Sequence, residues 1–143
     1  MKIKIFFAAL SFISILNLSC SKDNNDPSTY QIAGLWIGTY TVTQLPQAPP
    51  AFYSFSIKPD GKILVEGVGA NGKSYYSAGT WALNGTTFTT TYLSINYDGG
   101  GGQVTQSSTT TYNSKGTMTG TWTDTANPNG GSLSGTLTLS RVN

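Results

Sequence analysis

The feature that most constrains the fold is a strand-like alternation of large and small or polar side chains that restarts after each turn. It begins at residues 32–43, where Trp36 and Tyr40 fall on the same face of an extended chain. The unit Gly-x-Trp occurs at residues 34–36, 79–81 and 120–122. We interpret the tryptophan face as the inner one, where each glycine either leaves room for a neighbouring indole or lets the strand coil sharply.

Turn-forming residues divide the chain into segments of this kind. Asn71-Gly72 and Asn84-Gly85 are favoured in tight hairpin turns, and the prolines of residues 44–50 predict a loop because proline cannot serve a central strand. The predicted strands are residues 31–43, 51–58, 62–68, 73–83, 86–97, 103–112, 117–124 and 132–142. No apolar pattern with helical spacing appears in this region, so the sequence predicts an all-β domain.

Eight strands joined mostly by short turns form an antiparallel meander, which closes either as a sandwich or as an up-and-down barrel. The barrel is favoured because it pairs the last strand with the first and leaves no exposed edge. Gly34-Leu35-Trp36 in the first strand resembles the Gly-x-Trp signature of lipocalin-like barrels, the calycin group that includes fatty-acid-binding proteins and avidins. The resemblance implies an eight-stranded antiparallel barrel over residues 32–143 that binds a small ligand.

The N-terminal residues predict export and lipidation. The chain of 143 residues starts with a short basic segment, continues with the apolar run 5–18 and reaches its single cysteine at Cys20. The run is shorter than the roughly 20 residues of a membrane-spanning helix and is typical of a signal peptide. Residues 16–20, Leu-Asn-Leu-Ser-Cys, resemble a bacterial lipobox, which implies cleavage before Cys20 and its acylation, for example with palmitate. The alternative is a signal peptidase I substrate with an incidental thiol.

The expected organisation is a lipoprotein signal peptide at 1–19, a flexible tether at 20–31 and a barrel at 32–143. Each buried methylene of an acyl chain contributes about 0.8 kcal/mol, so a lipid on Cys20 would attach the protein to a membrane without spanning it. The tether begins Cys-Ser-Lys-Asp, which resembles an export signal of surface-displayed Gram-negative lipoproteins, although any soluble linker is polar. The sequence therefore predicts an outer-membrane, lipid-anchored and surface-exposed protein.

Charge and composition argue against nucleic-acid binding and catalysis. Cleavage would leave six basic and six acidic side chains, hence no net charge to attract nucleic acid. The chain has no histidine and its cysteine is assigned to lipid, so a His-based general base and a Cys/His metal site are excluded. Glu66 and Asp124 fall on opposite faces, which separates the carboxylates that a glycosidase would need together. The segment 124–130 predicts an Asn/Gly turn rather than a Ca²⁺ loop. We expect no enzyme activity, cofactor or metal.

Aromatic side chains dominate the predicted interior. The residues predicted to line a ligand cavity are Trp36, Tyr40, Tyr53, Phe55, Trp81, Phe88, Tyr92 and Trp122. Eight-stranded barrels either fill their interior or hold one small ligand. Two functions therefore stay open: binding of a small apolar or glycan ligand against these rings, or a filled barrel that acts as a protein-interaction or enzyme-inhibitor module through loops 44–50 and 99–102.

Overall fold

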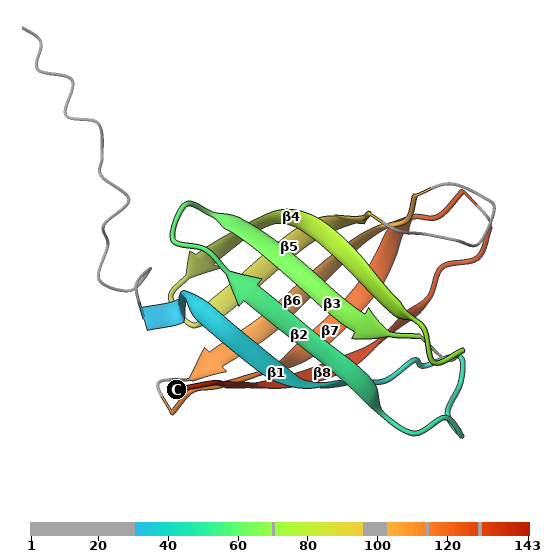
Figure 1. Cartoon of the computed structure of the whole chain (residues 1–143), viewed down its shortest axis with the longest axis horizontal. Coiled ribbons are helices and arrows are strands. Elements are labelled where there is room, and N and C mark those ends of the chain that lie inside the picture. The colour runs from blue at the N-terminus through green and yellow to red at the C-terminus, as the bar shows by residue number, and fades with distance from the viewer. Residues whose placement is uncertain (1–30, 70, 96–102, 114, 129) are drawn as a thin grey trace, which may run out of the picture.

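The protein is a closed antiparallel barrel whose strands follow one another in sequence order (Figure 1). The computed structural model describes residues 31–69, 71–95, 103–113, 115–128 and 130–143. The strands are β1 Gly34–Tyr40, β2 Ala51–Ile57, β3 Lys62–Val68, β4 Ser74–Asn84, β5 Thr87–Ser94, β6 Thr105–Asn113, β7 Thr117–Ala126 and β8 Ser134–Arg141. β8 pairs with β1, which confirms the predicted barrel and excludes the sandwich.

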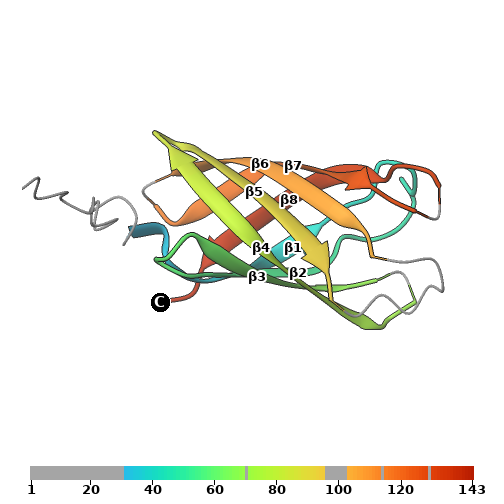
Figure 2. The same cartoon turned by 90° about the horizontal axis from the view of Figure 1, so that it is seen from above.

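The strands run obliquely to the long axis of the barrel (Figures 1 and 2). Their side chains alternate between its interior and its surface. In β5, every second residue from Phe88 to Ser94 is buried, while the residues between them are exposed. The weakest of the predicted strands, β6, is present although its inward residues include Ser108 and Thr110. The hydroxyls of Thr90 and Ser108 lie 2.6 Å apart, so polar groups inside the barrel bond to each other across strands.

A dense aromatic and aliphatic core fills much of the barrel. Its fully buried side chains include Trp36, Phe55, Phe88, Met118 and Leu139. The ring of Phe55 lies 6.3 Å from those of both Phe88 and Tyr92, in tilted or edge-on arrangements that aromatic pairs prefer. Among the described residues, no helix is long and apolar enough to cross a membrane.

Inward-facing glycines allow neighbouring strands to approach closely. A Cβ atom on Gly38, Gly79 or Gly120 would lie only 1.9, 2.0 or 2.1 Å from a backbone carbonyl oxygen of the adjacent strand. Gly79 and Gly120 belong to the Gly-x-Trp units, so these two permit tight coiling of the sheet rather than space for an indole. Gly34 differs, because it is the first residue of β1 and its φ of +133° is a conformation that favours glycine.

The first strand starts later than predicted. Gln31 and Ile32 have helical conformation instead of continuing β1, so the prediction that this strand begins at Gln31 is wrong. The indole N–H of Trp36 donates to the carbonyl oxygen of Ile32 at 2.8 Å, and the side chain of Ile32 is fully buried. Arg141 donates to the carbonyl oxygens of Gln31 and Ala33 at 2.6 and 3.1 Å. These contacts hold Ile32 over the core, which an extended segment would not do.

The two ends of the barrel are therefore different. Ile32, Arg141 and the short connections β2–β3, β4–β5 and β6–β7 lie at one end, which we call the closed end (Figure 1). The connections β1–β2, β3–β4, β5–β6 and β7–β8 lie at the other, the open end. β8 begins at Ser134 rather than at residue 132, so Leu133 precedes the strand, and it is 41% exposed.

Candidate functional site

A cavity of about 610 Å³ occupies the open end of the barrel. Residues from all four connections or from the strand ends beside them contribute to its wall. Its lining consists of Tyr40, Val42, Leu45, Gly69, Asn71, Lys73, Ser74, Tyr75, Ser77, Ser94, Val104, Gln106, Trp122, Asp124, Asn127 and Leu133. The barrel is thus neither solid nor hollow throughout: its core fills the closed end, and space remains at the open end.

Three aromatic rings form one wall of the cavity. Tyr40 stands between Tyr75 and Trp122, with ring centroids 6.4 and 5.8 Å away and interplanar angles of 87° and 75°. The Tyr40 hydroxyl donates to the carbonyl oxygen of Val68 at 3.0 Å. Edge-on contacts and this hydrogen bond fix the ring of Tyr40 and present a rigid aromatic surface to a ligand.

Two glycines determine where the other two rings lie. A Cβ atom on Gly67 would lie 2.3 Å from the Cζ atom of Tyr75, so the Tyr75 ring occupies the space that a side chain on β3 would fill. A Cβ atom on Gly135 would lie 2.8 Å from Nε1 of Trp122. Here the glycine does leave room for a neighbouring indole, which was one of the two roles predicted for such residues.

Asp124 places a carboxylate in the cavity wall. Its side chain faces inward from β7 and the residue is only 8% exposed. Oδ1 accepts a hydrogen bond from Gln106 Nε2 at 2.9 Å, and Oδ2 accepts from Asn127 Nδ2 at 3.1 Å and from the backbone N–H of Leu133 at 3.2 Å. Glu66 lies on the outer face, where Tyr76 donates to it at 3.3 Å. The prediction that these two carboxylates face opposite sides is confirmed.

A pair of tyrosines lies next to the aromatic wall, deeper in the barrel. The hydroxyls of Tyr53 and Tyr92 are 2.5 Å apart and both residues are buried. Burial raises the pKa of Tyr53, and the neighbouring tyrosine hydroxyls raise it further. Burial also raises the pKa of Tyr92, whereas its hydrogen bond to Tyr53 lowers this pKa by a smaller amount. Both phenols are therefore neutral at physiological pH and satisfy each other's hydrogen bonding.

Burial likewise raises the pKa of Tyr75, and Tyr40 and the carboxylate of Asp124 add to the shift. The cavity wall thus offers aromatic faces and the neutral hydroxyl of Tyr75, with Asp124 as the one carboxylate among the described lining residues.

The eight predicted cavity residues divide by their depth in the barrel. Tyr40 and Trp122 line the cavity. The other six, Trp36, Tyr53, Phe55, Trp81, Phe88 and Tyr92, belong to the core or pack against it and do not line the cavity. Cys20 and the loop residues 99–102 lie outside the described residues.

Trp36 and Trp81 lie near the closed end. Trp36 bonds to Ile32, and the indole N–H of Trp81 donates to the carbonyl oxygen of Lys58, the residue that follows β2, at 2.9 Å. Each of these indoles forms a hydrogen bond between its strand and a segment near the closed end, and neither lines the cavity.

Sequence reasoning did not assign several lining residues to the site. Tyr75 follows the Asn71-Gly72 turn closely, and this position is the signal that it lies at a barrel end. Asp124 and Gln106 also had an available signal, because both occupy inward positions close to strand ends. Leu45 and Leu133 lie in connections, where no alternation indicates the direction of a side chain.

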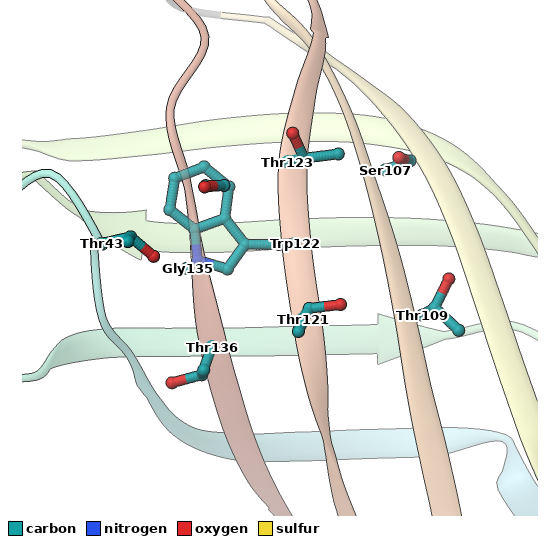
Figure 3. A pocket seen from close by; sticks show the side chains of 9 residues that line it. Thr43, Ser107, Thr109, Thr121, Trp122, Thr123, Gly135 and Thr136 are labelled. Atoms are coloured by element: carbon teal, nitrogen blue, oxygen red, sulfur yellow. The ribbon is translucent and has the colours of Figure 1, made fainter.

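A second hollow, of about 310 Å³, lies on the outside of β6, β7 and β8 (Figure 3). Serine and threonine side chains from these strands line it, and Thr109, Thr121 and Thr136 lie side by side on neighbouring strands. Figure 3 also shows the Trp122 indole extending across Gly135 of β8. The lining is mostly hydroxyl and methyl groups on an outer sheet surface, without an enclosing wall of large apolar groups.

The open-end cavity is the better candidate for a binding site. It has about twice the volume of the outer hollow and combines aromatic and aliphatic walls with a few polar groups, as small-molecule sites usually do. None of the protein-family models, curated proteins or solved structures compared with this chain matches it.

Proposed function

We propose that the protein binds a small, largely apolar ligand in the cavity at the open end of the barrel and does not catalyse a reaction. The observation that carries the proposal is the cavity itself, about 610 Å³ in volume, with Tyr40, Tyr75 and Trp122 on one wall. This volume lies within the range of about 300–1,000 Å³ that is usual for small-molecule sites. The rings offer flat surfaces to an apolar or glycan ligand, and the surrounding polar groups would orient it.

The barrel architecture supports a relationship to the lipocalin-like proteins. The strand order and the β1–β8 closure match what the Gly34-Leu35-Trp36 motif implied, and Trp36 packs in the core close to the start of β1. A ligand at the mouth of a small barrel is also what that resemblance implies. The family assignment is part of the proposal.

We further propose that the protein is a lipoprotein of the outer membrane, displayed at the cell surface through acyl chains on Cys20. The support comes from the basic start, the apolar run at residues 5–18 and the lipobox-like residues before the cysteine. Cys20 precedes the barrel by enough residues for a tether. No nucleic-acid partner is proposed, because the processed chain would carry equal numbers of acidic and basic groups.

The alternative function was a filled barrel that contacts a protein through its loops. The cavity argues for the ligand-binding function instead, since solid packing at the open end would have left no space for a small molecule. The non-catalytic part of the proposal is supported by the separation of Glu66 and Asp124 onto opposite faces of the sheet.

Native mass spectrometry of the protein purified from its own host tests the ligand. We expect an added mass of a few hundred daltons that denaturation releases. The variant Ser77→Phe, which puts a ring into the cavity from β4, should abolish this adduct, whereas Ser56→Phe, which adds the same ring to the outside of β2, should retain it. The proposal would be contradicted if the wild type carried no added mass, or if the two folded variants carried the added mass equally.

A further inference from the structure

The cavity has a charge that its apolar walls do not explain. Asp124 is buried beside Gln106 and Asn127, and the three donors to its carboxylate from the described residues are neutral amide N–H groups. Removing a carboxylate from water is unfavourable, and neutral hydrogen bonds compensate for this only in part. The negative charge therefore remains available to a cationic group that enters the cavity.

Among the described residues, the one salt bridge found joins Lys62 and Asp60 at 3.7 Å, at the β2–β3 turn near the closed end, and does not involve Asp124. Lys73 lines the same cavity from the β3–β4 side. The field of the carboxylate reaches into the barrel, because it contributes, after burial and the nearer tyrosines, to the raised pKa of Tyr75.

The aromatic wall adds to the same electrostatic preference. The faces of Tyr40, Tyr75 and Trp122 carry negative partial charge, and a cation within about 6 Å of such a face is attracted to it. All three rings line the cavity together with Asp124. A cationic nitrogen in this space would meet an anion and aromatic faces, while the apolar remainder of the ligand would contact Val42, Val104 and Leu133.

We infer that the ligand is an organic ammonium ion, a small molecule with a protonated or quaternary amine on an apolar body. The inference rests on the proposed function, because it assigns a ligand class to the same cavity. The amine would lie between the Asp124 carboxylate and the aromatic wall. A protonated amine would also donate a hydrogen bond to the carboxylate, which a quaternary ammonium cannot do.

Isothermal titration calorimetry with three probes that share one apolar body tests the charge preference. The probes are phenylbutylamine, phenylbutanol and phenylbutyrate, titrated into the processed wild-type protein at neutral pH. We expect the amine to bind roughly tenfold more tightly than the alcohol, and the acid to bind most weakly. Equal binding of amine and alcohol, or tighter binding of the acid, would overturn the inference while leaving the proposed function intact. If none of the three binds below about 1 mM, the proposed function fails as well.

Two variants separate the charge from the structure around it. Asp124→Asn should remove the roughly tenfold advantage of the amine and leave phenylbutanol binding within about twofold of wild type. Glu66→Gln removes a carboxylate from the outer face of β3 and leaves Asp124 in place, so the amine should keep its advantage. An amine preference that survives in Asp124→Asn with phenylbutanol still bound would overturn the inference.

Discussion

The indole N–H of Trp122, on β7, donates to the backbone carbonyl oxygen of Thr41, just beyond β1, at 2.9 Å. The indole reaches that oxygen across Gly135 of β8, so one side chain links three neighbouring segments at the rim of the cavity. This link depends on the absence of a side chain at position 135.

Replacing Gly135 by alanine should therefore destabilise the barrel. The new Cβ would lie 1.8 Å from the Thr41 carbonyl oxygen and 2.8 Å from Trp122 Nε1, and backbone cannot yield as easily as a flexible side chain. We expect the free energy of unfolding to fall by about 3 kcal/mol, measured by denaturant titration. The control Thr138→Ala, on the exposed face of the same strand, should change it by less than about 0.5 kcal/mol. A Gly135→Ala variant as stable as this control would show that the close approach is not required.

Replacing Gly67 by alanine should weaken ligand binding more than stability. The Cβ would meet the far end of the Tyr75 side chain at 2.3 Å, and that ring can move where backbone could not. Displacement of the ring changes the aromatic wall, so we expect phenylbutanol to bind about fivefold more weakly by calorimetry. Tyr75→Ala alone should weaken binding to a similar extent, and adding Gly67→Ala to it should have no further effect because the ring that clashes is gone. A further loss of affinity in the double variant would show that ring displacement is not the cause.

High pH should destabilise the protein through Tyr53 and Tyr92. Burial raises the pKa of both phenols above the ordinary value of about 10. Below that value the folded and unfolded states both keep the protons, so stability does not depend on these groups. Above about pH 10 the unfolded state releases the protons while the folded state retains them, and the free energy of unfolding should fall by about 1.4 kcal/mol per tyrosine per pH unit.

Denaturant titrations between about pH 9 and pH 11 measure this fall. The double variant Tyr53→Phe/Tyr92→Phe removes both groups and should show a shallower decline. An equally steep decline in the double variant would assign the alkaline sensitivity to other residues.

Replacing Arg141 by lysine should destabilise the closed end of the barrel. Its guanidinium donates to two carbonyl oxygens, those of Gln31 and Ala33, and a lysine ammonium does not reproduce this fork. We expect Arg141→Lys to lower the free energy of unfolding by about 1 kcal/mol and to accelerate hydrogen exchange of the Trp36 indole N–H. Lys62→Ala, which breaks an exposed ion pair elsewhere, serves as the control. Unchanged indole exchange in Arg141→Lys would refute this role.

Replacing Cys20 by alanine should remove membrane attachment. With no thiol to acylate, the variant should lose incorporation of labelled palmitate and move from the membrane fraction to the soluble fraction when expressed in a Gram-negative host. The variant Ser21→Ala keeps the cysteine and should fractionate like the wild type. Retention of Cys20→Ala in the membrane without label would contradict the proposed anchor.

Within the strands, the face of a residue could be predicted from the sequence, but its depth along the barrel could not. Trp36 and Trp122 have the same alternation and the same preceding glycine, yet one packs in the core near the closed end and the other lines the cavity. Depth depends on strand tilt and register. Trp36 pairs with Phe55 and Arg141, whereas Trp122 pairs with Ser108 and Gly135. The alternation of side chains does not tell which residue of a neighbouring strand lies opposite a given residue, so it does not determine the register.

The start of β1 was missed for a related reason. Apolar Ile32 fitted the alternating pattern, but it is buried in a helical conformation instead of a strand. Trp36 donates a hydrogen bond to its carbonyl oxygen, and Arg141, far away in sequence, donates to the carbonyl oxygen of its neighbour Gln31. Local propensity does not include such distant partners.

Arg141 holds Gln31 at the closed end of the barrel. The proposed lipid anchor on Cys20 would therefore join the barrel at the end opposite the cavity, which would leave the mouth of the cavity at the end farther from the attachment point. Solutes arriving from the surroundings could then enter without crossing the headgroup layer.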